Sequence, residues 1–437
     1  MQLIAYTFIY FLRQKAGRTP QIISKLFYSF LALLIANNLI GQSNSKVHST
    51  DILHFWEAFD LIVTESDSLK QIAILDSLYL SRASIGLDKI REVRNYQAAE
   101  YIELINRYPK FWNSIRPNTL KAPQLETELN KGIRDLQMLY PKLKPADIYF
   151  TIGAMRTNGT TQGNKVLIGG ELAMGDSNID LSEFEGRTKA WLENYFATEP
   201  IQNLVFLNIH EFVHTQQKAM PQSLLFISFY EGIAEYLAVQ VTGKASPVPA
   251  INYGKAHPAV KKKFEAEMFE EKLYEWLWSN APNEFDTRDL AYYIGYAIAE
   301  MYHLKSPDKA QALIDLIDLD YSKETKVLQM IDQSGFFEKK ILKQDTLSSL
   351  KDPEKYLGQY IYLKGELKQG DKFQLLGVAV DSSFLAVESS DYIAGGILLK
   401  IEPEAADDNE ASSLDAEYRL VSLFTGANAK AYPLKPN

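Results

Sequence analysis

The spacing of apolar and polar positions predicts helices along much of the chain. From Asp51 to about Leu143 the apolar residues recur at helical spacing, which predicts three or four amphipathic helices. One of them covers Ile90–Ile115 and is broken at Pro109. The pattern is helical again from Ile201 to about Ser334, where six prolines mark the breaks between helices.

Two short runs between these helical stretches predict strands. Residues 147–152 and 165–169 are rich in β-branched and aromatic side chains. The link between them, residues 156–163, contains an Asn-Gly pair and other turn-forming residues. We expect the second strand to lie either inside its sheet or at an edge, where an extended peptide could pair with it.

The pattern changes beyond Gln344 to short β-prone runs, such as Tyr360–Lys364 and Gly396–Ile401. The predicted fold class is therefore α+β. A mainly helical domain with a small sheet covers residues 44–343, and a small β-rich domain covers residues 344–437.

The first 43 residues differ in composition from the rest. An apolar run covers Leu3–Leu12, and basic residues follow between Arg13 and Lys25. A second apolar run extends from Leu26 to Ile40, and small and polar residues come next. This order is typical of a secretory signal peptide, and an uncleaved signal anchor is the alternative. We expect a mature N-terminus near residues 42–44 and an exported protein in the periplasm, the cell envelope or the extracellular medium. A membrane tether is expected only through this segment.

Composition narrows the chemistry. Apolar residues make up 46% and charged residues 23% of 437 residues, which is ordinary for a folded protein. The formal net charge of −9 argues against a nucleic-acid surface. There is no cysteine, so any metal site has to use His, Asp or Glu, and only six histidines are present.

One motif carries clear chemistry. His210-Glu211-Phe212-Val213-His214 has the form H-E-x-x-H, and no Gly or Pro interrupts the seven residues before it. Residues four apart lie on one face of a helix, so both imidazoles can bind one cation. Glu211 stands beside that cation as the general base for its water. The alternative is a pair of ordinary helix-surface histidines.

A third ligand is needed, and a carboxylate is the natural choice. Glu231 follows His214 after a break at Pro221, which can start a second helix. Glu235 lies one turn further on and would accept the free N–H of a ligand histidine. The alternative for Glu231 is a capping box with Ser228.

These residues resemble the gluzincins, zinc peptidases in which a Glu on a following helix completes the H-E-x-x-H site. The segment Glu231-Gly-Ile-Ala-Glu-Tyr is similar to their Glu-Gly-x-Ala signature, with a slightly shorter gap after the second His. The longer run resembles predicted zinc-dependent proteases of bacterial envelopes. The resemblance covers about residues 147–303. It implies a zincin-like fold, one Zn²⁺ held by His210, His214 and Glu231, and a peptide or protein substrate.

A donor to the developing oxyanion is also expected. The tyrosine-rich segment around Gly295 offers Tyr293, which the resemblance favours, and then Tyr296. Tyr292 and Tyr296 share a helix face, and the alternative is an aromatic packing stripe. The predicted function is an exported zinc peptidase. The alternative is a catalytically inactive envelope protein that keeps this fold for binding.

Overall fold

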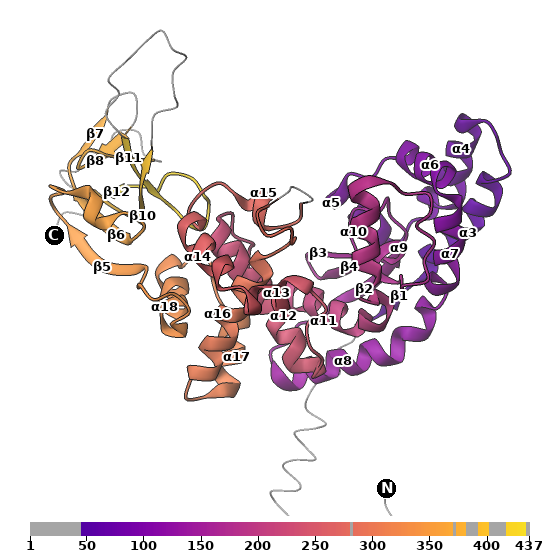
Figure 1. Ribbon diagram of the computed structural model, residues 1–437, viewed down its shortest axis with the longest axis horizontal. Coiled ribbons are helices and arrows are strands. Elements are labelled where there is room, and N and C mark those ends of the chain that lie inside the picture. The colour runs from indigo at the N-terminus through magenta and orange to yellow at the C-terminus, as the bar shows by residue number, and fades with distance from the viewer. Residues whose placement is uncertain (1–44, 280–282, 370–372, 382–391, 402–416, 434–437) are drawn as a thin grey trace, which may run out of the picture. The chain divides into compact units, whose positions relative to one another are not determined.

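The computed structural model describes residues 45–279, 283–369, 373–381, 392–401 and 417–433, and the fold is of the α+β class (Figure 1). The first 43 residues, with the predicted signal segment, lie outside the described residues. Helices dominate up to Ser334 and strands dominate from Leu342 onward.

Six short helices form the first region, where the sequence predicts three or four. The predicted helix over Ile90–Ile115 is three helices, because Asn95 adopts a left-handed conformation (φ 50°) at one break and Pro109 starts a new helix at the next. The six helices are α3 (Thr50–Ile62), α4 (Ser68–Leu78), α5 (Ile85–Arg94), α6 (Ala98–Arg107), α7 (Pro109–Thr119) and α8 (Glu126–Leu139).

A four-stranded sheet follows, in the order β1-β2-β4-β3. β1 (Val47–His48), β2 (Asp147–Thr151) and β4 (Lys165–Gly169) are parallel, and β3 (Gly159–Gln162) runs antiparallel to β4. The predicted turn over residues 156–163 therefore contains a strand. β4 is an interior strand, and β3 takes the edge position.

Ten helices follow the sheet, and two of the prolines that mark predicted breaks, Pro249 and Pro258, begin helices. The helices are α9 (Gly170–Ala173), α10 (Gly186–Phe196), α11 (Leu204–His214), α12 (Leu224–Thr242), α13 (Pro249–Ala256), α14 (Pro258–Glu267), α15 (Leu273–Trp276), α16 (Ala291–Lys305), α17 (Lys309–Ile317) and α18 (Glu324–Ser334).

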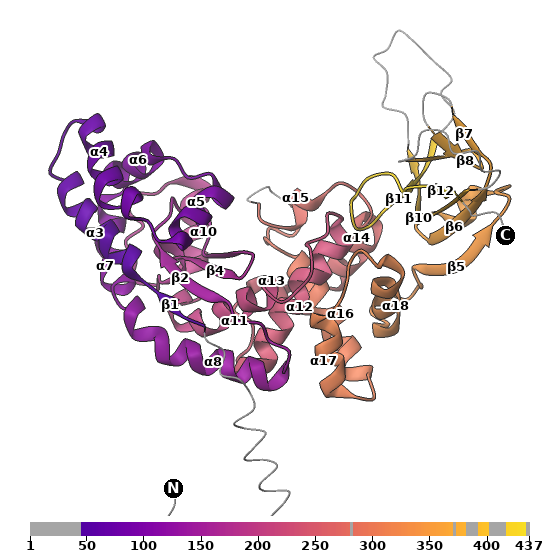
Figure 2. The same cartoon turned by 180° about the vertical axis from the view of Figure 1, so that it is seen from behind.

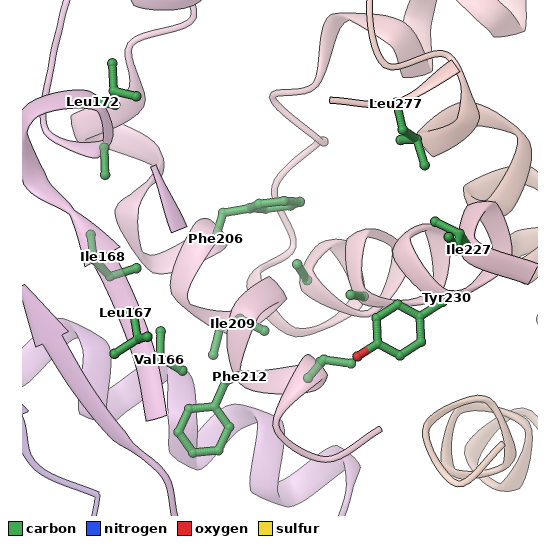
Figure 3. Close-up of a cluster of buried hydrophobic side chains, with 14 of the residues drawn as sticks. Val166, Leu167, Ile168, Leu172, Phe206, Ile209, Phe212, Ile227, Tyr230 and Leu277 are labelled. Atoms are coloured by element: carbon green, nitrogen blue, oxygen red, sulfur yellow. The ribbon is translucent and has the colours of Figure 1, made fainter. Parts of the chain in front are cut away.

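α11 packs between the small sheet and α12 (Figure 3). Ile209 and Phe212 of α11 lie toward Val166 and Leu167 of β4, and all four side chains are buried. This apolar contact fixes how α11 sits on the sheet, so the polar side chains of the same helix have a defined direction.

α12 is apolar on nearly all sides. By length and composition it could cross a membrane, but 83% of its most apolar window is buried within the fold, which is typical of a core helix. A Cβ on Gly232 would lie 2.0 Å from the backbone of Gly295 in α16. Gly232 thus allows the close approach of α12 to α16. Figure 2 shows α12 and α16 next to each other from behind.

The C-terminal region is a mixed sheet of eight described strands with its own apolar cluster, which includes Ile361, Leu398 and Leu420. Glu324 of α18 accepts hydrogen bonds from this region, from the Ser422 hydroxyl and the Phe424 amide. The strands are β5 (Leu342–Leu347), β6 (Tyr360–Gly365), β7 (Leu367–Gln369), β8 (Phe373–Leu375), β9 (Val378–Val380), β10 (Tyr392–Ile401), β11 (Glu417–Val421) and β12 (Tyr432–Pro433).

Candidate metal centre

Three side chains from α11 and α12 meet at one point. Nε2 of His210 lies 3.1 Å from Nε2 of His214, and Oε2 of Glu231 lies 3.4 Å and 3.3 Å from those two nitrogens. Ligand atoms about 2.0–2.1 Å from a tetrahedral ion stand about 3.3–3.4 Å apart. The three atoms therefore have the spacing of three corners of a metal-centred tetrahedron, and this buried group could hold a metal ion.

The far side of each imidazole is fixed by a different partner. Nδ1 of His214 lies 2.6 Å from Oε1 of Gln217, whose amide nitrogen donates to the carbonyl of Tyr230. Nδ1 of His210 lies 2.8 Å from Oε2 of Glu235, at an angle too bent for a regular hydrogen bond. Acceptor oxygens at both Nδ1 atoms favour protons there, which leaves both Nε2 lone pairs turned toward Glu231.

The contact between His210 and Glu235 is extended by a third residue. Ser246, in the segment after α12, donates its hydroxyl proton to Oε1 of Glu235 and accepts a hydrogen bond from the amide of Val248. Glu235 is almost completely buried, so this hydroxyl supplies a partner for its second oxygen. The structure thus places Glu235 behind His210, with a partner near each of its two oxygens, and its role toward a metal ligand stays a prediction.

Ser228 does not cap α12. The helix begins at Leu224, after Ser223, and the Ser228 hydroxyl donates to the carbonyl of Leu224 within the second turn. The capping-box alternative for Glu231 is therefore excluded, and the Glu231 carboxylate is turned to the histidines.

The charges of this group are strongly coupled. Burial by itself lowers the pKa of His210, but the contacts with Glu231 and Glu235 raise it well above its ordinary value. Burial likewise opposes ionisation of Glu231, yet His214 and His210 hold its pKa far below its usual range. A positive charge is thus favourable at the point where these three atoms meet, and a bound cation or a shared proton could supply it.

Glu211 faces the edge strand of the small sheet. A Cβ on Gly159, the first residue of β3, would lie 2.7 Å from Oε1 of Glu211, so only glycine leaves room for this carboxylate. Burial raises the pKa of Glu211, and the positive charges of His210 and His214 offset part of that rise. The carboxylate is thus held beside the metal-binding group without being one of its three closest members.

Tyr292, at the start of α16, is the tyrosine of that helix nearest the ligands. Its ring centroid lies 6.0 Å from that of His210, and its hydroxyl accepts a hydrogen bond from the indole N–H of Trp278 at 3.3 Å. Burial raises the pKa of Tyr292 well above its ordinary value, and the negative charge of Glu231 adds to the rise. The phenol therefore keeps its proton and can donate it in a hydrogen bond.

The structure places Tyr293 and Tyr296 elsewhere. The ring of Tyr293 packs on Gly254 and lies 6.3 Å from the ring of Phe336. The ring of Tyr296 lies 5.3 Å from that of Tyr236, with the ammonium group of Lys255 over its face. Both tyrosines have packing partners away from the ligands, and their catalytic role stays a prediction.

His257 and His303, which the sequence treats as ordinary histidines, lie apart from the metal-binding group. Nδ1 of His257 contacts the carbonyl of Tyr253, and the side chain is exposed. Nδ1 of His303 lies 2.7 Å from the hydroxyl of Tyr236.

Four residues near the centre lie outside the H-E-x-x-H motif: Gln217, Ser246, Gly159 and Tyr292. Only for Tyr292 does the sequence offer another indication, the helical spacing that puts it on one face with Tyr296 while Tyr293 points about 100° away. The other three come from loops or from a short polar strand, and only the folded chain brings them to the helices.

A cavity of about 940 Å³ lies away from this centre. It lies beside α14 and the C-terminal strands, with Phe269, Leu399 and Arg419 among the lining residues. None of the metal-binding residues lines it. Histidines and a carboxylate converge at His210, His214 and Glu231, so we place the candidate functional site there rather than in this cavity.

The chain matches no protein-family model, no curated protein and no solved structure. The candidate metal centre therefore rests on the positions of its own side chains.

Proposed function

We propose that this protein is an exported zinc-dependent peptidase whose metal is held by His210, His214 and Glu231. One observation carries the proposal: three buried lone-pair-bearing atoms lie 3.1–3.4 Å from one another, and carboxylate or amide oxygens face the opposite sides of both imidazoles. Three acceptors at such spacing are unfavourable unless a cation or a shared proton lies between them.

Zinc suits this set of donors. Two imidazoles and one carboxylate are a common ligand set of catalytic zinc, and a tetrahedral ion then keeps its fourth position for water. The neighbouring carboxylates of Glu211 and Glu235 add negative charge to the surroundings of the ion, which favours a divalent cation.

The protein's own groups can supply the remaining parts of a hydrolysis. Zinc in such a site lowers the pKa of its bound water to about 7 and polarises the scissile carbonyl. Glu211, whose pKa burial raises, would accept the proton of the attacking water and pass it to the leaving amine. Tyr292 would donate a hydrogen bond from its hydroxyl group to the developing oxyanion. Its hydroxyl proton is free for this, because the indole N–H of Trp278 binds only a lone pair of the Tyr292 oxygen.

The edge strand β3 offers a way to position the substrate. An extended peptide paired along β3 would pass Gly159 and so lie beside Glu211. The missing side chain at position 159 would let the peptide backbone and the general base approach each other.

Metal analysis of the purified protein tests the proposal, with Glu211→Gln as the matched variant. We expect about one zinc per chain in both proteins and hydrolysis of a peptide library by the wild type alone. Because residue 211 is not a ligand, its substitution removes proton transfer without removing the metal; a loss of the general base costs about 10²–10⁴-fold in turnover. Absence of zinc from the wild type, or full activity of Glu211→Gln, would contradict the proposal.

A further inference from the structure

Arg288, just before α16, lies over the face of an aromatic side chain. The carbon of its guanidinium lies 5.1 Å from the ring centroid of Trp191 in α10. The Trp191 ring is stacked on that of Tyr195, one turn further along the helix, at 5.9 Å. A cation over an indole face is attracted to it, which favours this position of the guanidinium.

The guanidinium has donors to spare. Its Nε is buried and has no hydrogen-bond acceptor among the described residues, and the nearest carboxylate oxygen, on Asp289, is 3.6 Å away. Asp289 already accepts a hydrogen bond from the amide of Trp278 at 2.7 Å. The Arg288 side chain is nonetheless 30% exposed, so a solute can reach it.

One line of contacts leads from Arg288 to the metal ligands. The amide of Trp278 binds Asp289, and the indole N–H of the same tryptophan donates to Tyr292, whose ring lies beside that of His210. The charge of Glu231 raises the pKa of Asp289 further, beyond the rise that burial causes, which places the Asp289 carboxylate within electrostatic range of the third ligand.

A second line of contacts leads from Arg288 to the general base. Tyr195, stacked on Trp191, accepts a hydrogen bond from the side-chain amide of Asn158 at 3.0 Å. Asn158 precedes Gly159, which lies directly against Glu211. The two lines meet at Arg288, which is thus connected to His210 through Trp278 and Tyr292 and to Glu211 through Tyr195 and Asn158.

The segment that carries Arg288 is conformationally strained. Trp278, Asp286 and Asp289 all have left-handed backbone conformations, with φ of 55°, 45° and 60°. Each such residue costs on the order of 1 kcal/mol when it is not glycine. Asn283 stabilises the segment by accepting hydrogen bonds from the amides of Phe285 and Thr287.

We propose that Arg288 is a specificity residue that binds a carboxylate group of the substrate. This inference rests on the proposed peptidase function. The Arg288 guanidinium lies over Trp191, its ion pair with Asp289 is long at 3.6 Å, and its Nε has no hydrogen-bond acceptor among the described residues. Such a guanidinium can donate two parallel N–H groups to a carboxylate in a two-pronged hydrogen bond. In a peptide this chemistry has two sources, the free C-terminus and the side chain of Asp or Glu.

Two matched pairs of peptides test the proposal and separate these sources. The first pair differs only in a free or an amidated C-terminus, and the second pair carries Glu or Gln at one position and is amidated. We expect the wild type to favour the carboxylate member of at least one pair by about 10- to 100-fold in kcat/KM, mainly through KM. The loss of one charge-assisted hydrogen bond weakens binding by about that factor.

Two variants of Arg288 and one control show whether the guanidinium causes the preference. Arg288→Gln brings the ratio within a pair close to one, and Arg288→Lys retains part of it because the charge stays while the planar fork is lost. Arg107→Gln on α6, an exposed arginine elsewhere on the surface, keeps the wild-type ratio. A wild-type ratio of one in both pairs, or an unchanged ratio in folded Arg288→Gln, overturns the proposal.

A binding measurement keeps this test separate from catalysis. The same peptides are titrated into Glu211→Gln and into Glu211→Gln/Arg288→Gln, and tryptophan fluorescence is recorded because Trp191 lies under the guanidinium. Tighter binding of the carboxylate member only when Arg288 is present supports the inference even where the wild type cleaves nothing, which would be a failure of the proposed function alone. Equal binding of both members by both proteins overturns the inference and leaves the proposed function standing.

Discussion

α12 and β10 are both buried central elements, but they treat charge in opposite ways. β10 pairs with β6, β11 and β12, and its one charged residue, Lys400, is exposed and pairs with Glu354. α12 buries two carboxylates, Glu231 and Glu235, within an otherwise apolar helix. An element that serves only stability keeps charges out of the interior, because a buried charge without a partner costs several kcal/mol. The buried carboxylates of α12 are thus costly for stability unless they have partners, which fits the proposed metal site.

The same contrast holds for the two regions as wholes. Among the described residues, the buried Asp, Glu and His side chains all precede residue 335. The C-terminal sheet from Leu342 onward has an apolar core and contributes none of them. The burial of ionisable groups therefore points to the helical region as the place of the proposed function, independently of any motif.

The largest effect is expected when the proposed metal ligand Glu231 is replaced and compared with a residue of the C-terminal core. Glu231→Ala should lose the bound metal, while Leu398→Ala in the C-terminal core should cost about 2–5 kcal/mol of unfolding free energy and leave the zinc content of the folded protein unchanged. Metal analysis together with urea denaturation measures both quantities. If Glu231→Ala keeps its zinc and Glu235→Ala loses it, the assignment of the third ligand is reversed.

A second prediction concerns Glu171, a completely buried carboxylate after β4. It accepts hydrogen bonds from the amides of Gly153 and Met155, yet burial raises its pKa to about 7. Between pH 4.5 and 7 the folded protein holds a proton that the unfolded chain has released, so stability should fall as the pH rises through this window, by up to about 3 kcal/mol.

Urea denaturation at pH 5 and pH 8, with chelator present throughout, checks the sign. Glu171→Gln should remove this part of the pH dependence, and the exposed control Glu128→Gln should leave it in place. A wild-type protein and a Glu171→Gln variant with the same pH dependence would show that Glu171 is ionised in both states.

The smallest of the three effects is expected at Glu235 and Gln217, whose side chains contact the Nδ1 atoms of His210 and His214. Glu235→Ala should weaken zinc binding by about 10–100-fold, because the carboxylate raises the basicity of His210 and fixes its ring. Gln217→Ala should weaken it less, since a neutral amide fixes the ring of His214 without adding charge. Competition with a chelator of known affinity gives both values, and equal losses would mean that ring orientation alone matters.

The sequence contains much of this site because helical spacing is local. His210 and His214 share a face wherever that segment is helical, and Glu231 and Glu235 do so on the next helix. Residues that approach from other elements could not be predicted in this way. The four-residue strand β3, with the sequence Gly-Thr-Thr-Gln, has no apolar run to reveal it, and Gln217 and Ser246 stand in segments without periodicity.

The tyrosines show how two kinds of inference compete. The four-residue spacing puts Tyr292 and Tyr296 on one face, and the structure places Tyr292 beside His210. The family resemblance favours Tyr293, whose ring lies on Gly254. Helical spacing groups Tyr292 with Tyr296, but only Tyr292 has its ring beside that of His210, so neither the spacing nor the resemblance singles out this tyrosine.

The crossing of α12 and α16 also has an evolutionary consequence. A Cβ on Gly295 would lie 1.7 Å from the carbonyl oxygen of Ser228, and one on Gly232 would meet the backbone of α16. Glu231 and Tyr292 lie one and three residues from these glycines, so either substitution would move a ligand and the aromatic ring together. Any descendant of this chain that keeps its chemistry inherits both glycines. A lineage in which one is replaced is expected to have drifted to a different use of the fold.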